Sequence, residues 1–356
     1  MTEMCVNAKP YSIPHDAALL LTLLPTVATV FGNLAGNAWA SANIVLLGIM
    51  ATLDWTLGED PHHEQCVRAM DVVLPVVHMV MYSLGIFSLL WSVGHHRLNG
   101  IALVLAIIST GIHSTSVGGN SAHELVHKSR WERAVGSFAL GLIFYSHFSI
   151  EHRRGHHARF GLADDPTSAR RGESIYGFFL RTSIYQFVSA VRLEQARLRK
   201  GAPGQFPVNL AIIGKICETC CAAALILVFR WEIGLIYVLH ALATMFFIQF
   251  PNYIGHYGLE REPGDQANAW HSWETDHRVS GLMLLHVGRH YDHHLHPTRR
   301  FSLLQSHRSG ARLPSGLYGL LPVVMLPPLW YRLMHPILDK RYGNTCTPRK
   351  LTFTVS

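Results

Sequence analysis

Histidines at ligand-like spacing are the residues of this sequence best suited to chemistry. The chain has 24 histidines among 356 residues. Three clusters stand out, HELVHK (His123–Lys128), EHRRGHH (Glu151–His157) and RHYDHH (Arg289–His294), and a single further candidate lies in NYIGHYG (Asn252–Gly258). The nine candidate ligands are His123, His127, His152, His156, His157, His256, His290, His293 and His294. Nine ligands are too many for one ion and about right for two.

Spacing indicates how these side chains converge. Positions i and i+4 of a helix lie on one face. We therefore predict that His123 and His127 point to one shared point, and that His152 and His156 do the same. The adjacent pairs His156–His157 and His293–His294 can serve two neighbouring metals. We expect interfacial positions for His62, His63, His95 and His96, and packing or supporting roles for His78, His113, His147, His240, His271, His277 and His286.

Neutral imidazole suits zinc, copper, iron and nickel, so spacing alone leaves the metal open. The segment His123–His127 also matches the HExxH pattern of zinc proteases. Such a protease needs only one further ligand and has no use for two more histidine clusters. We therefore set the protease interpretation aside.

A metal-bound imidazole usually donates its other N–H group to a carboxylate or carbonyl. Residues in or beside the clusters could accept it, and we expect this role for Glu124, Glu151, Asp165, Asn252 and Asp292. The carboxylates could instead pair with Arg153, Arg154 or Arg289. Both interpretations remain open at this point.

The elements that position the clusters are apolar helices. The chain is 49% hydrophobic and only 15% charged, which is unusual for a soluble domain. Crossing a bilayer takes roughly 17 to 25 apolar residues. We predict an all-α integral membrane protein with about six spans, in the blocks Ala17–Phe31, Ala38–Leu53, Val72–Val93, Leu98–Val117, Ile212–Phe229 and Ile233–Phe250.

The net charge of +7 does not indicate nucleic-acid binding, because the basic residues gather in alternate connections between the blocks. This pattern places both termini and every histidine cluster on the cytoplasmic side. A further apolar block, Ala134–Ile150, would separate two clusters if it spanned, so we expect a buried or re-entrant helix there. The proline-interrupted segment Leu317–Leu329 is expected to pack without spanning.

We expect one membrane-embedded domain over residues 1–356. Its parts are four spans in 17–117, the first two histidine motifs in 118–207, two spans in 208–253 and a cytoplasmic cap with the third motif in 254–356. The six cysteines contain one CxxC pair, in Cys217–Cys220. A thiolate iron site needs two such pairs. Any rubredoxin-type electron carrier is therefore expected to be a separate protein.

The four motifs resemble, in order and spacing, those of membrane alkane 1-monooxygenases within the histidine-rich desaturase and hydroxylase superfamily. The likeness extends to LDWTLGED (Leu53–Asp60), DDPTSARRGESIY (Asp164–Tyr176), HSWETDH (His271–His277) and LPSGLYG (Leu313–Gly319). Gly255 and Val287-Gly288 depart from the family pattern, which usually has Glu and Leu-Gln there. These departures lie outside the ligand positions and bear on substrate choice and the electron-donor surface.

The resemblance implies a cytoplasmic-side cap in which two non-haem irons are bound by the nine histidines, in a bacterial cytoplasmic membrane. It also implies O2 as co-substrate and electrons from rubredoxin, or a ferredoxin-type donor, with its reductase. The expected reaction converts medium-chain n-alkanes to 1-alkanols. The alternatives are hydroxylation of arene methyl groups, as in xylene monooxygenase, action on fatty-acyl chains, and, from another class, a metal transporter. A transporter would hold its ligands near the bilayer midplane, whereas most clusters lie in polar segments.

Overall fold

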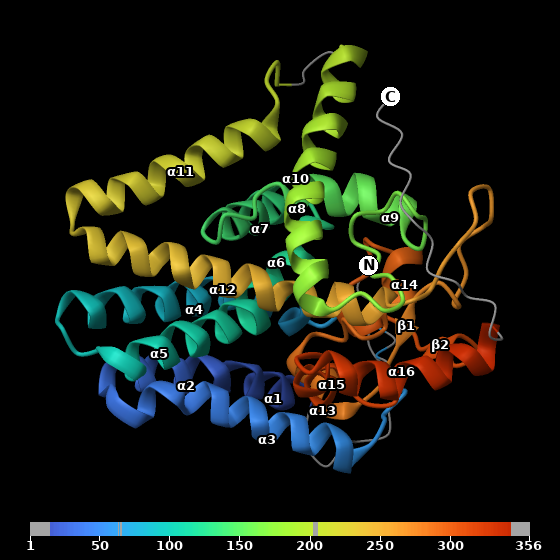
Figure 1. Ribbon diagram of the computed structural model, residues 1–356, viewed down its shortest axis with the longest axis horizontal. Helices are drawn as coiled ribbons and strands as arrows, with labels where there is room; N and C mark the ends of the chain where they lie inside the picture. Colours follow the sequence, from blue (N-terminus) through green and yellow to red (C-terminus); the bar gives the residue numbers. More distant parts are fainter. Residues whose placement is uncertain (1–14, 63, 65, 202–205, 343–356) are drawn as a thin grey trace.

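The computed structural model describes residues 15–62, 64, 66–201 and 206–342, and Figure 1 shows the helical arrangement. The helices α1 to α9 and their connecting turns are α1 (His15–Leu19), η1 (Leu20–Leu23), α2 (Leu24–Ala35), η2 (Asn37–Ser41), α3 (Ala42–Leu57), α4 (Ala69–Gly94), α5 (Gly100–His113), η3 (Ser114–Gly119), α6 (Asn120–Val126), α7 (Arg130–Gly141), α8 (Phe148–Glu151), η4 (His152–His156) and α9 (His157–Arg159). The rest are α10 (Ile175–Lys200), α11 (Leu210–Val228), α12 (Trp231–His256), β1 (Trp273–Glu274), α13 (Arg278–Met283), α14 (His290–Leu295), η5 (Phe301–Leu303), β2 (Ala311–Arg312), α15 (Leu317–Val324) and α16 (Pro327–Tyr342).

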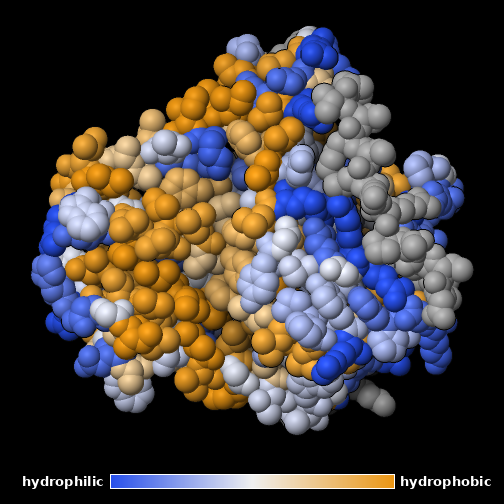
Figure 2. Space-filling model, in the orientation of Figure 1, coloured by the Kyte–Doolittle hydropathy of each residue, from blue (hydrophilic) through white to orange (hydrophobic). Residues whose placement is uncertain are grey.

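Six helical segments are long and apolar enough to cross a membrane. They are 16–35, 37–57, 69–94, 100–126, 210–228 and 231–256. Figure 2 shows an apolar surface over this bundle, with hydrophilic residues gathered over the C-terminal elements and along the opposite edge. The chain is therefore an all-α, multi-pass membrane protein, as its composition predicts.

Two spans run further than their apolar blocks. The fourth continues through a π-helical turn, η3, into α6 and so includes His123, and the sixth continues from Phe250 to His256. The polar residues at their ends are helical because they prolong a helix already formed, which costs no new nucleation. Metal-ligand candidates thus stand at the ends of membrane helices.

Residues 134–150 do not form a continuous helix. The helix α7 ends at Gly141, a turn follows, and α8 begins at Phe148. The side chain of Glu218 on α11 accepts a hydrogen bond of 2.8 Å from the Ser146 backbone N–H in this turn. Part of the segment is therefore held against a neighbouring span, and none of it lies within the six candidate spans.

Polar side chains join the helices inside the bundle. Asn33 donates to the Ser88 and Thr110 hydroxyls over 2.9 and 3.1 Å, and one His78 ring nitrogen lies 2.7 Å from the Ser121 hydroxyl. Lipid tails are as apolar as the helix surfaces, so apolar packing alone does not determine which helices pair. Hydrogen bonds of this kind add that specificity. They fit the packing role expected of histidines outside the clusters.

The C-terminal cap, residues 257–342, packs on one end of the bundle and forms a core around Trp330, Met334 and Tyr257. Its short parallel β-bridge pairs Trp273 with Ala311. Asp54 at the end of α3 accepts hydrogen bonds from the backbone N–H groups of Ser280 and Gly319 over 2.9 and 3.1 Å. The cap is thereby fixed to the end of α3.

Candidate metal centre

Eight of the nine predicted histidines converge in two compact groups. Group A comprises His123, His127, His152 and His293, and group B comprises His156, His256, His290 and His294. Within each group the ring nitrogens lie within 4.8 Å of one another. Each group draws ligands from three segments of the chain, so it forms only in the folded protein, and either could hold a metal ion.

The ninth histidine, His157, lies beside group A and next to group B. Its Nε2 atom is 3.0 Å from Nε2 of His152 and 3.2 Å from Nε2 of His293. Its ring centroid is 4.6 Å from that of His294. Its position between the groups would suit a fifth ligand on the group A side.

The prediction that His152 and His156 share one point is wrong. The two rings belong to different groups, because η4 is a π-helical turn. A π-helix places residues i and i+5, instead of i and i+4, in register. His152 therefore meets His157, and His156 is directed to group B. The expected pairing of His123 with His127 is confirmed, and His293 and His294 do address different groups.

The helix α14 supplies both groups. His290 and His294 are four residues apart and join group B, whereas His293 faces group A. His256 comes from the end of α12, and its Nε2 atom lies 3.0 Å from that of His290. One short helix in the cap therefore fixes the position of one group relative to the other.

The donors fit metal binding. The Nε2 atoms of His127 and His156 are buried without a hydrogen-bond partner among the described residues, and the Nε2 atoms of His123 and His152 face each other at 2.8 Å. Burial lowers the pKa of His290 to about 3 and the pKa values of His152, His293 and His294 well below the usual range. These imidazoles are neutral near pH 7, which is the form that binds metals.

Two of the ligand candidates are oriented through their other ring nitrogen. The Nδ1 atom of His156 is 2.8 Å from Asp165 Oδ2, which also accepts from the Ser168 hydroxyl at 2.7 Å. The Nδ1 atom of His256 is 3.2 Å from the His271 carbonyl oxygen. Both contacts favour the tautomer that leaves Nε2 free. The Asp165 contact was predicted, but the contact with a backbone carbonyl has no signal in the sequence.

The other carboxylates have different partners. Glu124 pairs with Lys128 at 3.1 Å. Asp292 pairs with Arg299 at 2.7 Å. Glu151 pairs with Arg159 at 3.0 Å, and burial together with the neighbouring Asp165 raises the pKa of Glu151 to about 7. These pairings are the alternative that the sequence left open, although the basic partners are not the arginines expected.

The side-chain amide of Asn252 is hydrogen-bonded to Gln249 and not to a ligand histidine. Its amide donates to the Gln249 side chain over 3.2 Å, and Gln249 in turn donates to the Tyr145 hydroxyl over 2.5 Å. This buried chain of polar groups joins α12 to the turn before α8. It holds the elements that carry His256 and His152 against each other.

Arg289 is a supporting residue that spacing did not reveal. Its fully buried guanidinium contacts Asp276 at 3.0 Å and donates to the Leu304 carbonyl over 2.7 Å. It therefore fixes the backbone immediately before His290. Breaking a buried pair of this kind costs about 3–5 kcal/mol. Asp276 lies within the HSWETDH segment that resembles the family, which was the available signal.

Comparison with known proteins agrees with this geometry. Residues 96–318 match the family model described as fatty acid desaturase. Alkane 1-monooxygenase 1 of Pseudomonas aeruginosa is 32% identical over 326 residues, covering 86% of this chain and 85% of the relative. The chain belongs to the alkane 1-monooxygenase family. Within this family, alkane 1-monooxygenase 2 of Alcanivorax borkumensis is 28% identical over 363 residues, covering 96% of this chain and 94% of the relative.

The xylene/toluene monooxygenase hydroxylase component XylM of Pseudomonas putida is a more distant relative of this alkane 1-monooxygenase family member. It is 25% identical over 236 residues, covering 63% of this chain and 62% of the relative. The family match contains His123, His127, His152, His156, His157 and the later clusters. Monooxygenase chemistry is therefore established for this chain at the level of the family.

Proposed function

We propose that this protein hydroxylates the terminal methyl group of medium-chain n-alkanes to give 1-alkanols. The observation that carries the proposal is the pair of four-histidine groups at the ends of apolar membrane helices, in a chain whose relatives are named alkane 1-monooxygenases. The nine histidines are the proposed ligands of two irons, with His157 completing group A. One atom of O2 enters the product, and two electrons and two protons reduce the other to water.

Iron held by the neutral imidazoles would bind and activate O2 for attack on an unactivated C–H bond. The protein positions the ligand rings and excludes water from them. Phe148 stacks on His152 with ring centroids 4.6 Å apart, and Phe160 stacks on His294 at 4.1 Å. These rings exclude water from one side of each histidine group. Asp165 holds the proton on Nδ1 of His156 and so keeps Nε2 available to the metal.

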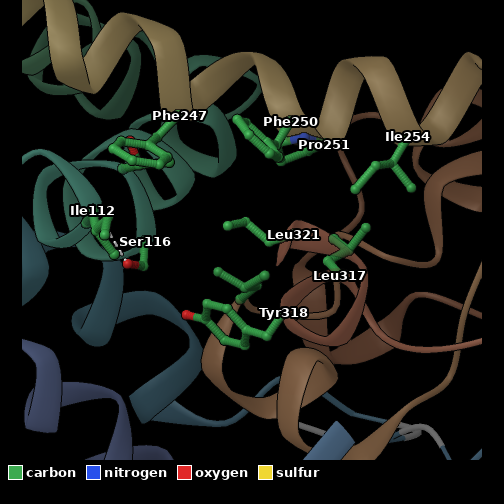
Figure 3. Close-up of a pocket in the computed structure, with 11 residues that line it drawn as sticks. Ile112, Ser116, Phe247, Phe250, Pro251, Ile254, Leu317, Tyr318 and Leu321 are labelled. Carbon is green, nitrogen blue, oxygen red and sulfur yellow. Dashed lines mark hydrogen bonds between the residues drawn. The ribbon is translucent and has the colours of Figure 1, made fainter. Parts of the chain in front are cut away.

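An apolar cavity favours a hydrocarbon substrate. Figure 3 shows Phe250 and Ile254 of α12 facing Leu317 and Leu321 of α15 across this space. The cavity lining is almost entirely apolar, and the cavity lies beside the last turns of α12, the helix that ends at His256. We propose that the alkane enters from lipid between the spans and lies in this cavity with its methyl end toward the histidines.

We also propose how the protein is oriented in the membrane and which carrier supplies its electrons. Both termini and the histidine groups face the cytoplasm across a bacterial cytoplasmic membrane, because the basic connections lie on that side. The proposed cytoplasmic part of the single domain, residues 254–356, contains the cap. Electrons come from a separate rubredoxin, or a ferredoxin-type carrier, and its reductase.

The experiment feeds octane and p-xylene in parallel to membranes that contain this chain, O2 and a reduced rubredoxin system. We expect 1-octanol as the main product, and none in membranes carrying a His127→Ala, His156→Ala double variant. The likeness to XylM favours hydroxylation of an aromatic methyl group as a second candidate. A benzylic alcohol with little octanol would replace the first candidate with the second.

A further inference from the structure

Four oxidisable side chains are in continuous contact beside group B. Tyr253 lies on α12, Tyr257 follows the last residue of that helix, and Trp330 and Tyr331 lie on α16. The ring centroid of Tyr257 is 5.2 Å from those of Tyr253 and Trp330 and 6.4 Å from that of Tyr331, which is the range of aromatic rings in contact. We call these four residues the tyrosine–tryptophan chain.

The tyrosine–tryptophan chain begins at a proposed metal ligand and ends at the surface. Tyr257 follows His256 directly in the sequence. Tyr253, Tyr257 and Trp330 are fully buried, whereas Tyr331 is half-buried and stacks on His335, also half-buried, with ring centroids 5.2 Å apart. Electron tunnelling falls steeply with distance, so several short steps between touching rings are faster than one long step. These contacts therefore offer a stepwise route between group B and solvent.

Tyr257 also has the proton acceptor that its oxidation requires. Its hydroxyl oxygen accepts from the Gly172 backbone N–H over 2.9 Å, so its own hydrogen is free to donate to Nε2 of His335, 2.9 Å away. A phenol that loses an electron becomes strongly acidic and releases this proton. Burial and the charge of Arg171 lower the pKa of His335, so its ring is neutral near pH 7 and can take the proton. The hydroxyl of Tyr253 donates instead to a backbone carbonyl, which cannot.

We propose that the tyrosine–tryptophan chain carries oxidising equivalents from group B to the surface when no hydrocarbon is bound. The inference rests on the proposed function, because O2 activated without a substrate has only the protein to oxidise. Tyr257 gives one electron to the oxidised centre and its phenol proton to Nε2 of His335. Tyr331 then returns an electron to Tyr257, directly or through the neighbouring Trp330, and the proton comes back from His335. A water-soluble one-electron reductant of the ascorbate or thiol class restores Tyr331, so the net change is one electron moved from that reductant to the centre.

The test mixes the reduced, iron-loaded protein with O2 in the absence of hydrocarbon, freezes it, and records electron paramagnetic resonance. Tyr257→Phe and Tyr331→Phe keep the rings that packing needs, and iron content equal to wild type shows that each variant has folded. Tyr237→Phe is the matched control, because this buried tyrosine lies near the start of α12, whereas His256 ends that helix. We expect a tyrosyl radical in the wild type and in Tyr237→Phe, and its loss in Tyr257→Phe. In Tyr331→Phe the radical should form but outlast the wild-type radical when ascorbate is added.

Peptide mass spectrometry gives a second readout that packing alone would not change. Under O2 without hydrocarbon, Tyr257→Phe should accumulate oxidised histidine at His256, His290 and His294 faster than the wild type and Tyr237→Phe do. A wild type that consumes O2 and forms no tyrosyl radical would overturn the proposal. Equal histidine oxidation in Tyr257→Phe and the wild type would overturn it as well.

A light-driven measurement separates the tyrosine–tryptophan chain from the chemistry at the metals. A soluble ruthenium photo-oxidant, flashed in the presence of the wild type, removes an electron at the surface, and the vacancy should reach Tyr257 through Tyr331. A radical signal that Tyr257→Phe lacks, found in a protein that neither consumes O2 nor makes octanol, would support the route and contradict the proposed function. Octanol formation with no Tyr257 radical in either measurement would do the reverse.

Discussion

The Nδ1 atom of His156 lies 2.8 Å from the Oδ2 atom of Asp165, and both side chains are fully buried. This contact fixes the ring and its tautomer, and it joins group B to the loop after α9. Asp165 is held in turn by the Thr167 backbone N–H at 3.1 Å. Although burial acts to raise it, the contact with His156 and the hydrogen bonds from Ser168 and the Thr167 backbone keep the pKa of Asp165 below its usual range.

We predict that Asp165→Asn lowers iron affinity about 10- to 100-fold, because the amide no longer provides a charged acceptor for the His156 N–H. Iron content after dialysis against a graded chelator measures the change. The neighbouring Asp164→Asn is the matched control, since that side chain is 66% exposed. Equal iron retention by the two variants would show that the contact does not support the metal.

Each histidine group should bind its iron independently, so that removing a ligand from one group leaves the other group loaded. His127→Ala removes a group A ligand and His156→Ala a group B ligand. Each variant is expected to hold about one iron where the wild type holds about two, and both should lose octane hydroxylation. His95→Ala, in an exposed turn after α4, should leave the iron content unchanged. Iron and protein assays on the same sample decide the matter.

The cavity between α12 and α15 should set the accepted chain length. Leu321→Trp fills part of this cavity, so we expect the preferred substrate to shift toward shorter alkanes. Competition among hexane, octane, decane and dodecane, followed by product analysis, measures the shift. Leu329→Trp adds the same ring at an exposed position on α16. An unchanged product distribution for Leu321→Trp would contradict entry of the alkane through this cavity.

His147 predicts a pH dependence of stability. Burial, together with the charge of Lys215, lowers the pKa of His147 to about 3. Below about pH 6.5 the unfolded chain takes up a proton that the folded protein refuses, so stability is lost as the pH falls from 6.5. At pH 5 this one group accounts for about 2 kcal/mol.

His147→Leu should remove that share of the loss, because neither ring nitrogen has a hydrogen-bond partner among the described residues. The measurement is the melting temperature in detergent at pH 7 and pH 5. The difference between the two temperatures should shrink in His147→Leu and stay at the wild-type value in His95→Leu. An unchanged difference in His147→Leu would mean that this ring is protonated or hydrated in the folded protein.

The sequence predicted which histidines come together better than it predicted how they divide between the two groups. Apolar blocks predicted the spans, and the clusters identified His123 and His127 as partners, because both signals are local. The separation of His152 from His156 was not predictable from spacing, since a π-helical turn changes the period without an evident residue signature. Contacts such as the hydrogen bond from the Phe301 backbone to Glu124 join positions 177 residues apart. Such contacts follow from the packing of the cap and have no counterpart in local pattern.

Isotope incorporation tests the central claim most directly. Membranes containing this chain and a reduced rubredoxin system are supplied with octane and ¹⁸O-labelled O2, and the products are analysed by mass spectrometry. The proposed reaction predicts 1-octanol that carries one labelled oxygen atom. Unlabelled octanol, or an alkene without alcohol, would contradict oxygen insertion into the terminal C–H bond by this protein.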